Sequence, residues 1–162
     1  SVPMSRFGLS IGGNVEYDPI DAFEPAHLPT PGPFLLDHEV LAGPDHTAFH
    51  ALTADCFDAR GVYDATFGYN LARLNRDPRH PDAGFRYARE RGDPAVLRAE
   101  FTPTTPFCPQ SRSLTVGAFR AWNGRSDRHE YDRVRVRVHP MHDESLRINA
   151  ELKRLENVEW DD

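Results

Sequence analysis

The residues around Cys108 combine a thiol with a local sequence that could activate it. In residues 101–114, FTPTTPFCPQSRSL, strand-forming residues run into a turn bracketed by prolines. Pro109 suits the first position of a helix, because the N–H that it lacks would have no partner there. The pattern predicts Cys108 as a helix N-cap, where the helix dipole would stabilise a thiolate and favour reactivity or metal ligation. The alternative is a small apolar residue that closes a strand–helix junction.

A histidine downstream could complete such a site. His142 ends the run His139-Pro-Met-His142, which follows a predicted strand and could bring an imidazole near Cys108. Neutral imidazole is a good ligand for iron or zinc. The alternative is a loop histidine that caps backbone groups. A Cys–His–Asp hydrolase triad is conceivable, since a thiolate needs a base and an orienting group, but no spacing in the chain supports it.

Two further patterns have a chemical and a structural interpretation. Arg133, Arg135 and Arg137 alternate along one strand, about 7 Å apart on one face, and could contact an acidic partner. Such a row can equally be a solvated, edge-protecting face. His46 and His50 have the i,i+4 spacing of helical metal ligands, but without a third ligand surface histidines are the plainer reading.

The predicted elements that position these residues form an α+β fold. Strands 85–90 and 95–102 flank the turn Arg91-Gly-Asp-Pro94, and the second strand has one apolar face. On the first helix, the apolar stripe places Cys56 in the core. We predict a two-layer α/β sandwich, a small mixed sheet packed by helices in the order ααββαβα. The remaining elements are helices at 45–60, 64–77, 109–123 and 144–155, and a strand at 131–138.

The first 44 residues differ in composition from the rest. They are rich in proline and glycine, and residues 7–17 could form a hairpin across Gly12-Gly-Asn14. We expect residues 1–44 to be an extended N-terminal arm that lies on the domain, or a mobile tail, and that folding does not require; residues 45–162 would be the domain.

Composition narrows the class of protein. A net charge of −6 argues against generic nucleic-acid binding. No apolar run is long enough to cross a membrane, and no signal peptide is recognisable. Two cysteines cannot supply a disulfide framework or four thiolates, which favours a cytoplasmic protein with reduced thiols. Lys153 is the single lysine, a bias typical of a GC-rich and here archaeal genome.

The segment that ends at Cys108 resembles the strand–turn–cysteine signature of the MIP18/DUF59 family, whose members assist iron–sulfur cluster assembly. Val134–Val138 resembles the family's next strand. Residues 142–152, with His142 and Ile148-Asn-Ala-Glu-Leu152, resemble its "His…Ile-Asn-x-x-Leu" segment. Residues 77–81, DPRHP, resemble its Asp-Pro-Glu-His-Pro, with Arg79 in place of the acidic residue.

The resemblance implies an accessory factor in iron–sulfur cluster assembly or delivery, and not an enzyme. Cys108 would be the functional thiol, a transient ligand of iron or of a cluster, or a contact to carrier and client proteins. Thr104, Thr105 and Pro106 would shape its turn. A cluster would need ligands from a second chain, so a homodimer or heterocomplex would hold it. The alternatives are a small maturation subunit of a ring-oxygenase complex, or a purely structural protein-interaction module.

Overall fold

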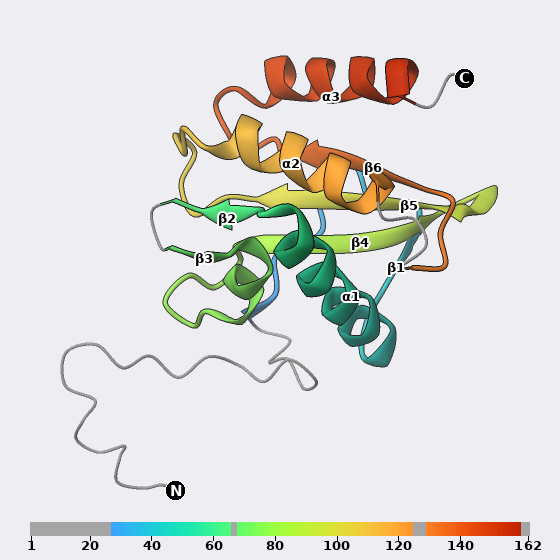
Figure 1. Ribbon diagram of the computed structural model, residues 1–162, viewed down its shortest axis with the longest axis horizontal. Coiled ribbons are helices and arrows are strands. Elements are labelled where there is room, and N and C mark those ends of the chain that lie inside the picture. Colours follow the sequence, from blue (N-terminus) through green and yellow to red (C-terminus); the bar gives the residue numbers. More distant parts are fainter. Residues whose placement is uncertain (1–26, 66–67, 125–128, 160–162) are drawn as a thin grey trace, which may run out of the picture.

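The computed structural model describes residues 27–65, 68–124 and 129–159. It confirms the α+β class: a four-stranded mixed sheet in the order β1-β4-β5-β6 packs against helices, and β2 and β3 pair separately (Figure 1). The elements are β1 (Glu39–Val40), α1 (Pro44–Arg60), β2 (Tyr63–Asp64), β3 (Tyr69–Asn70), the 3₁₀ helix η3 (Leu71–Arg76), β4 (Gly84–Glu90), β5 (Asp93–Thr102), α2 (Ser111–Gly124), β6 (Arg133–Val138) and α3 (Ser145–Glu159).

The hairpin of β4 and β5 forms the centre of the sheet, as its turn sequence predicts. The strands pair antiparallel from Gly84 opposite Thr102, and Gly92 takes a φ of 92° in the turn. Strand β6 then joins β5 in parallel, with Val96 opposite Arg133 and Phe101 opposite Val138. Parallel strands need a crossover, and α2 supplies it. The carboxyl ends of β5 and β6 therefore lie side by side at the same end of the sheet.

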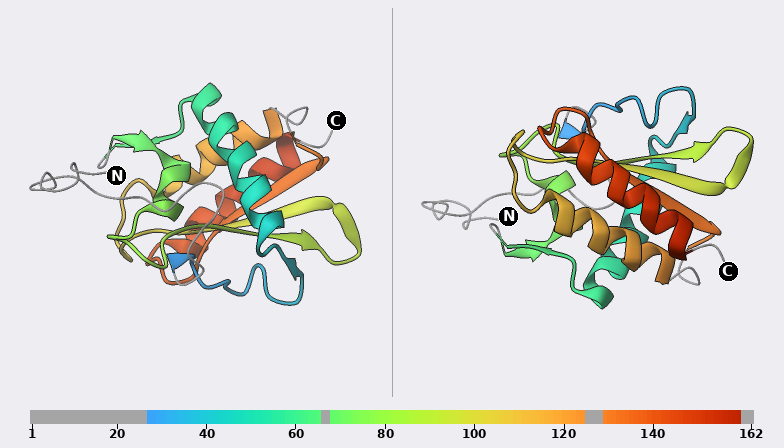
Figure 2. Two further views of the ribbon diagram at one scale, coloured as in Figure 1. Left: turned by 90° about the horizontal axis from the view of Figure 1, so that it is seen from below. Right: turned by 90° about the horizontal axis from the view of Figure 1, so that it is seen from above.

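Helices α1 and α2 cover one face of the sheet, and α3 lies beside α2 at the β6 edge (Figures 1 and 2). Alternate residues of each strand point to this face. Helix α1 starts with Pro44 and ends at Gly61, whose φ of 72° provides the left-handed C-cap. The largest fully buried side chains include Trp122, Tyr87, Phe57, Phe85, Phe101 and Phe119.

The helix predicted for residues 64–77 is wrong. The chain there forms the short strands β2 and β3 and then η3. Tyr63 pairs with Asn70 and Asp64 with Tyr69 in antiparallel register, and Gly68 takes a φ of 74°, which lies outside the right-handed helical region. Asn70 then caps η3 through its side chain, which accepts from Ala72 N. Leu71 and Leu74, whose spacing suggested an α-helix, are buried side chains of η3.

Three asparagine side chains satisfy backbone groups along the sheet. Each amide accepts from the N–H and donates to the C=O of one strand residue. Asn75 bonds Phe85, Asn123 bonds Val134, and Asn149 bonds Val138, with distances between 2.7 and 3.0 Å. Since β6 is an edge strand, Asn123 and Asn149 protect an edge that would otherwise carry unpaired groups. Gly84 gives Asn75 its room, because a Cβ there would lie 2.2 Å from Asn75 Oδ1.

The described part of the N-terminal arm is integral to the domain. Leu35 and Leu41 are buried, and β1 pairs Val40 with Ala88 of β4. The boundary expected at residue 44 therefore does not separate an arm from a domain, because residues 27–43 complete the sheet and cover it. The hairpin predicted at 7–17 lies outside the described residues. None of the described helices is at once long enough and apolar enough to cross a bilayer.

Candidate functional site

Two loops meet at the carboxyl ends of β5 and β6, and Cys108 lies in the first of them. Residues 103–110 connect β5 to α2, and residues 139–144 connect β6 to α3. Because β5 and β6 are parallel, both loops leave the sheet at the same end of the strands. In open α/β sheets, ligands bind preferentially outside the carboxyl ends of parallel strands. The topology therefore places the predicted thiol at an edge where binding sites are common.

Helix α2 begins at Ser111, so the prediction of Cys108 as its N-cap is wrong. Residues 106–110 instead form turns, in which Ser111 N donates to Cys108 O at 3.3 Å. The carbonyls of Pro106 and Cys108 accept hydrogen bonds from Asp143 N and His142 Nε2 of the neighbouring loop. Tight turns therefore form here in place of an early helical start. The thiol therefore lies three residues before the helix, and the predicted dipole argument does not apply to it.

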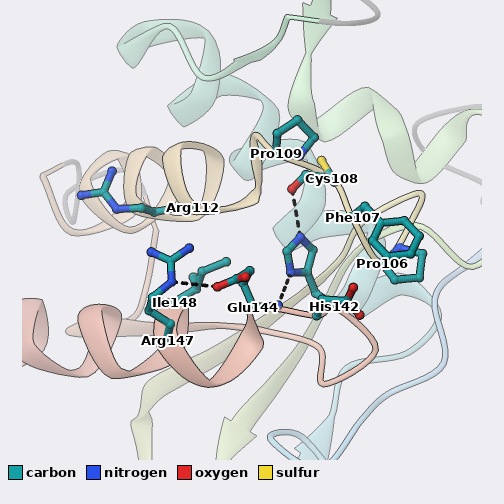
Figure 3. A pocket seen from close by; sticks show the side chains of 10 residues that line it. Pro106, Phe107, Cys108, Pro109, Arg112, His142, Glu144, Arg147 and Ile148 are labelled. Carbon is teal, nitrogen blue, oxygen red and sulfur yellow. Dashed lines mark hydrogen bonds and ion pairs between the residues drawn. The ribbon is translucent and has the colours of Figure 1, made fainter.

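His142 holds the two loops together through both ring nitrogens (Figure 3). Its Nε2 lies 2.9 Å from Cys108 O, and its Nδ1 lies 3.0 Å from Glu144 N. A backbone amide can only donate and a carbonyl can only accept. The imidazole is therefore in its neutral Nε2–H form, donating to Cys108 O and accepting from Glu144 N. The ring faces the carbonyl oxygen of Cys108 and not its sulfur. The structure therefore does not place the imidazole and the thiol together as the two metal ligands that the sequence suggested.

The predicted supporting turn contributes further bonds. Thr105 accepts from Phe107 N with its hydroxyl and from Cys108 N with its carbonyl, at 3.3 and 3.4 Å. Pro106 O accepts from Asp143 N of the second loop at 2.9 Å. Thr104 lies in the same bend. The backbone around Cys108 is thus held from within its own loop and from the loop after β6.

A surface pocket of about 220 Å³ opens between these loops and the first turns of α2 and α3. Figure 3 shows the Cys108 sulfur on the side of the carbonyl away from the imidazole. Phe107 stands at the pocket with 72% of its surface exposed. The lining residues are Pro106, Phe107, Cys108, Pro109, Arg112, His142, Asp143, Glu144, Arg147 and Ile148.

Two ion pairs involve the charged residues of the pocket, one between α2 and α3 and one at the start of α3. Arg112 of α2 forms a two-pronged ion pair with Glu151 of α3, with Nε at 2.7 Å from the carboxylate. Glu151 raises the pKa of Arg112 by this hydrogen bond, and Arg112 lowers the pKa of Glu151. Arg147 donates to Glu144 at 2.8 Å. The pocket rim is therefore close to neutral, with guanidinium edges beside an exposed aromatic ring.

The sequence predicted no role in the site for four residues that line the pocket, Phe107, Arg112, Glu144 and Arg147. One signal was present for Phe107: an aromatic residue between Pro106 and Pro109 cannot join a strand or a helix. The arginines and Glu144 became site residues only because α2 and α3 start side by side.

The arginine row on β6 is mostly engaged inside the protein. Arg135 bonds Glu90 at 2.9 Å and Glu156 at 2.8 Å, and Arg137 pairs with Glu156. Arg133, which begins the strand, is exposed. Arg135 and Arg137 therefore link β6 to α3, and Arg135 also links it to the end of β4, in place of the open partner surface that the alternation suggested.

His46 and His50 are both buried, and the interpretation as surface histidines is wrong. Their rings stack 5.6 Å apart on α1. His50 Nε2 lies 2.7 Å from Ala72 O, so Nε2 carries the proton and Nδ1 accepts from the Tyr87 hydroxyl at 2.6 Å. Burial lowers the pKa of His46 to about 3 and that of His50 to about 4. The pair belongs to the core beneath the sheet.

Cys56 is fully buried, and neither it nor Cys108 forms a disulfide. Across residues 27–65, 68–124 and 129–159, no group of three or more histidine, cysteine, aspartate or glutamate side chains is arranged to hold a metal ion. Cys108 as a metal ligand therefore remains a prediction from the sequence.

The comparison with family models corrects the resemblance to the MIP18/DUF59 family. The model that matches is described as Domain of unknown function (DUF7998), and it covers residues 15–162. No curated protein and no solved structure matches the chain significantly. The short signatures around Cys108 and His142 were local, whereas the family match extends over most of the sequence, from the arm to the last residue. The chain belongs to the DUF7998 family.

Proposed function

We propose that this domain is a non-catalytic protein-interaction module that receives a segment of a partner protein at the Cys108 pocket, with Phe107 as the anchor. One observation carries the proposal: Phe107 is 72% exposed on a backbone that hydrogen bonds hold on both sides. An exposed aromatic ring on a fixed backbone loses little conformational freedom on binding, and buried aromatic anchors dominate the energetics of interfaces.

The surroundings of Cys108 support a binding role over a catalytic one. The imidazole that lines the pocket is neutral, and both of its nitrogens are engaged with backbone groups. Activation of a thiol needs a base within hydrogen-bond reach of the sulfur. The pocket rim suits a partner segment that brings an apolar side chain to Phe107 and Ile148 and carbonyl or carboxylate oxygens to Arg112 and Arg147.

A role in iron–sulfur cluster assembly, or as a maturation subunit of a ring oxygenase, rested on the corrected resemblance and stays an untested prediction. Anaerobic reconstitution tests it directly, because Cys108→Ser should then abolish iron uptake. A cytoplasmic location with reduced thiols is part of our proposal, and it is supported by two cysteines that form no disulfide. The net charge of −6 supports a protein partner over a nucleic acid.

The experiment compares the full chain with two variants by affinity purification from the native host, followed by binding measurements with the purified partner. Phe107→Ala removes the anchor. Val158→Ala is the matched control, because Val158 is 73% exposed on α3 but does not line the pocket.

We expect a partner that wild type and Val158→Ala retain and that Phe107→Ala loses. Its Kd should rise at least about tenfold for Phe107→Ala, or about 1.4 kcal/mol. A partner that binds Phe107→Ala as tightly as wild type would place recognition elsewhere on the surface.

A further inference from the structure

The sheet face opposite α1 and α2 is covered by residues 29–35, which we call the strap. The strap contains no helix or strand, and its Leu35 is fully buried outside the main core. Leu35 N and Leu36 N both donate to Gly32 O, which closes a turn at its end. The strap therefore lies on the sheet as an extended peptide that ends in a turn.

Three sheet side chains bind the backbone of the strap. Arg86 donates to Pro29 O at 3.0 Å, and Arg98 donates to Phe34 O at 3.1 Å. Between them, Glu100 accepts from Gly32 N at 2.5 Å. Domains that recognise extended peptides gain affinity from such main-chain bonds and gain specificity from side-chain contacts. The strap is thus held in the manner of a bound peptide.

The specificity contacts are an aromatic ring and a glycine. The ring of Phe34 lies 4.5 Å from the Arg98 guanidinium carbon and 5.0 Å from that of Arg137, within the range of cation–π attraction. At Gly32, a Cβ would lie 2.6 Å from Glu100 Oε2 and 2.7 Å from His139 Cδ2. The face therefore fits a segment with glycine followed two positions later by an aromatic residue.

Closure of the strap carries a cost at Glu100. Its Oε2 is buried and has no hydrogen-bond partner among the described residues. Burial raises the pKa of Glu100, although the Gly32 amide, His139 and the Phe34 amide act in the opposite direction. The carboxylate therefore loses hydration that these contacts offset only in part, and this loss weakens closure. Hydrogen bonds hold the strap on the sheet, whereas the burial of Glu100 beneath it lowers the stability of the closed state.

The turn after the strap is strained. Asp37 takes a φ of 75°, in the left-handed region that non-glycine residues rarely adopt, and His38 N donates to Leu35 O across it. A short strained turn beside a peptide-like segment is the setting in which proteins exchange elements between copies, since opening relieves the strain.

We propose that the face of Arg86, Arg98, Glu100, Arg137 and His139 is a peptide-docking face that accepts the strap of a second copy of this chain in exchange for its own. The second copy is the occupant that we assign, because the strap is the sequence whose fit to this face is visible in the structure. Exchange uses the same contacts in trans and needs no new complementarity.

The first measurement uses the wild-type protein. In native hydrogen exchange, the amides of Gly32 and Leu35 should exchange through local opening, many times faster than ladder amides of β4 and β5 such as that of Ala99. If the strap amides exchange only with global unfolding, the strap does not leave the sheet and the proposal is overturned.

The second measurement uses a labelled peptide of residues 27–37 and full-length Gly32→Ala protein, whose own strap can seat only if the Glu100 and His139 side chains shift, so that it is held less firmly. The native peptide should bind this protein at least tenfold more tightly than a peptide with the same Gly32→Ala change. Gly117→Ala is the control protein, because a Cβ at Gly117 meets only ordinary contacts, at 3.7 Å from Val62. Equal binding of both peptides, or no binding to a folded Gly32→Ala protein, would overturn the docking face.

The third measurement decides the occupant. The Gly32→Ala chain has an intact docking face and a strap that fits it poorly. The Arg98→Ala chain has an intact strap and a docking face that lacks the Arg98 contacts to Phe34. Light scattering after size exclusion should show a dimer in the mixture and monomers for each variant alone. A mixture that stays monomeric while the peptide binds would overturn the second copy as occupant and indicate a different protein with the same Gly-x-aromatic segment.

Discussion

His142 donates from Nε2 to the carbonyl oxygen of Cys108 at 2.9 Å, across 34 residues of sequence. The same ring accepts from Glu144 N at 3.0 Å, so one neutral imidazole fixes both loops of the pocket. The histidine and the cysteine that the sequence suggested as joint ligands are therefore neighbours through the backbone of the cysteine. This relationship makes the pocket a preorganised surface.

Replacing His142 with alanine should loosen both loops. We expect a loss of about 1–3 kcal/mol in unfolding free energy, because Glu144 N and Cys108 O lose a buried partner. Urea denaturation measures the loss, and Leu146→Ala, at an 88% exposed position on α3, serves as the control with little effect. Unchanged stability in His142→Ala would show that the ring does not hold the loops.

The two thiols should react at different rates. Cys108 is half-buried at a surface pocket, whereas Cys56 has 0% of its surface exposed. Iodoacetamide at neutral pH should therefore modify Cys108 in the native protein and reach Cys56 only after unfolding. Mass spectrometry of labelled peptides gives both rates, with Cys108→Ser as the reference. Equal native rates for the two cysteines would contradict the burial of Cys56.

The side-chain amides of Asn123 and Asn149, which bond the backbone of β6, should contribute strongly to stability. Asn149→Ala leaves both backbone groups of the buried Val138 without their amide partner, and we expect a loss of about 2–4 kcal/mol. Asn157→Ala, at an exposed position on the same helix, should change stability by less than about 0.5 kcal/mol. Chemical denaturation of the three proteins checks this, and similar stabilities would mean that water replaces the Asn149 amide.

His46 and His50 should make folding sensitive to acid. Their pKa values in the folded protein are about 3 and about 4, below the ordinary value of 6.5. A lowered pKa in the folded state means that the unfolded chain binds the protons first. Stability from this pair is therefore complete above pH 6.5 and is lost as the pH falls toward 4 and 3. NMR titration of the ring protons checks the assignment, and titration of either ring near pH 6.5 would contradict it.

Glu100 should act in the opposite direction on the strap. Burial raises its pKa, so the strap is most stable below the ordinary value of 4.5 and is weakened as the pH rises through the raised value. Among the residues that the structure describes, the charged neighbours of Glu100 on this face are basic, and residues 29–35 bring no titratable side chain. These groups are Arg86 on β4, Arg98 on β5, Arg137 on β6 and His139 after it.

Glu100→Gln should remove this dependence and protect the Gly32 amide better than wild type at neutral pH. Hydrogen-exchange protection factors of Gly32 between pH 5 and 8 measure it, with the exposed Glu144→Gln as control. A Gly32 protection factor that is flat with pH in wild type would remove Glu100 from the strap's energetics.

The sequence by itself determined the elements whose signals are local. The β4–β5 hairpin follows from alternation and from the turn at Gly92, and α1 follows from its apolar stripe and from Gly61 at its end. Hydrophobic spacing also placed Cys56 in the core. Each of these depends on residues within a few positions of one another, so propensity and periodicity suffice.

Tertiary structure alone decided what the candidate functional residues do. His142 meets Cys108 O across 34 residues, Gly32 meets Glu100 across 68, and the Asn149 amide meets Val138 across 11. The partners of Arg135 on two other elements were equally invisible in its alternation along β6. A polar side chain carries no sequence signal for its partner, because its hydrogen bonds depend on which loops the sheet brings to one edge.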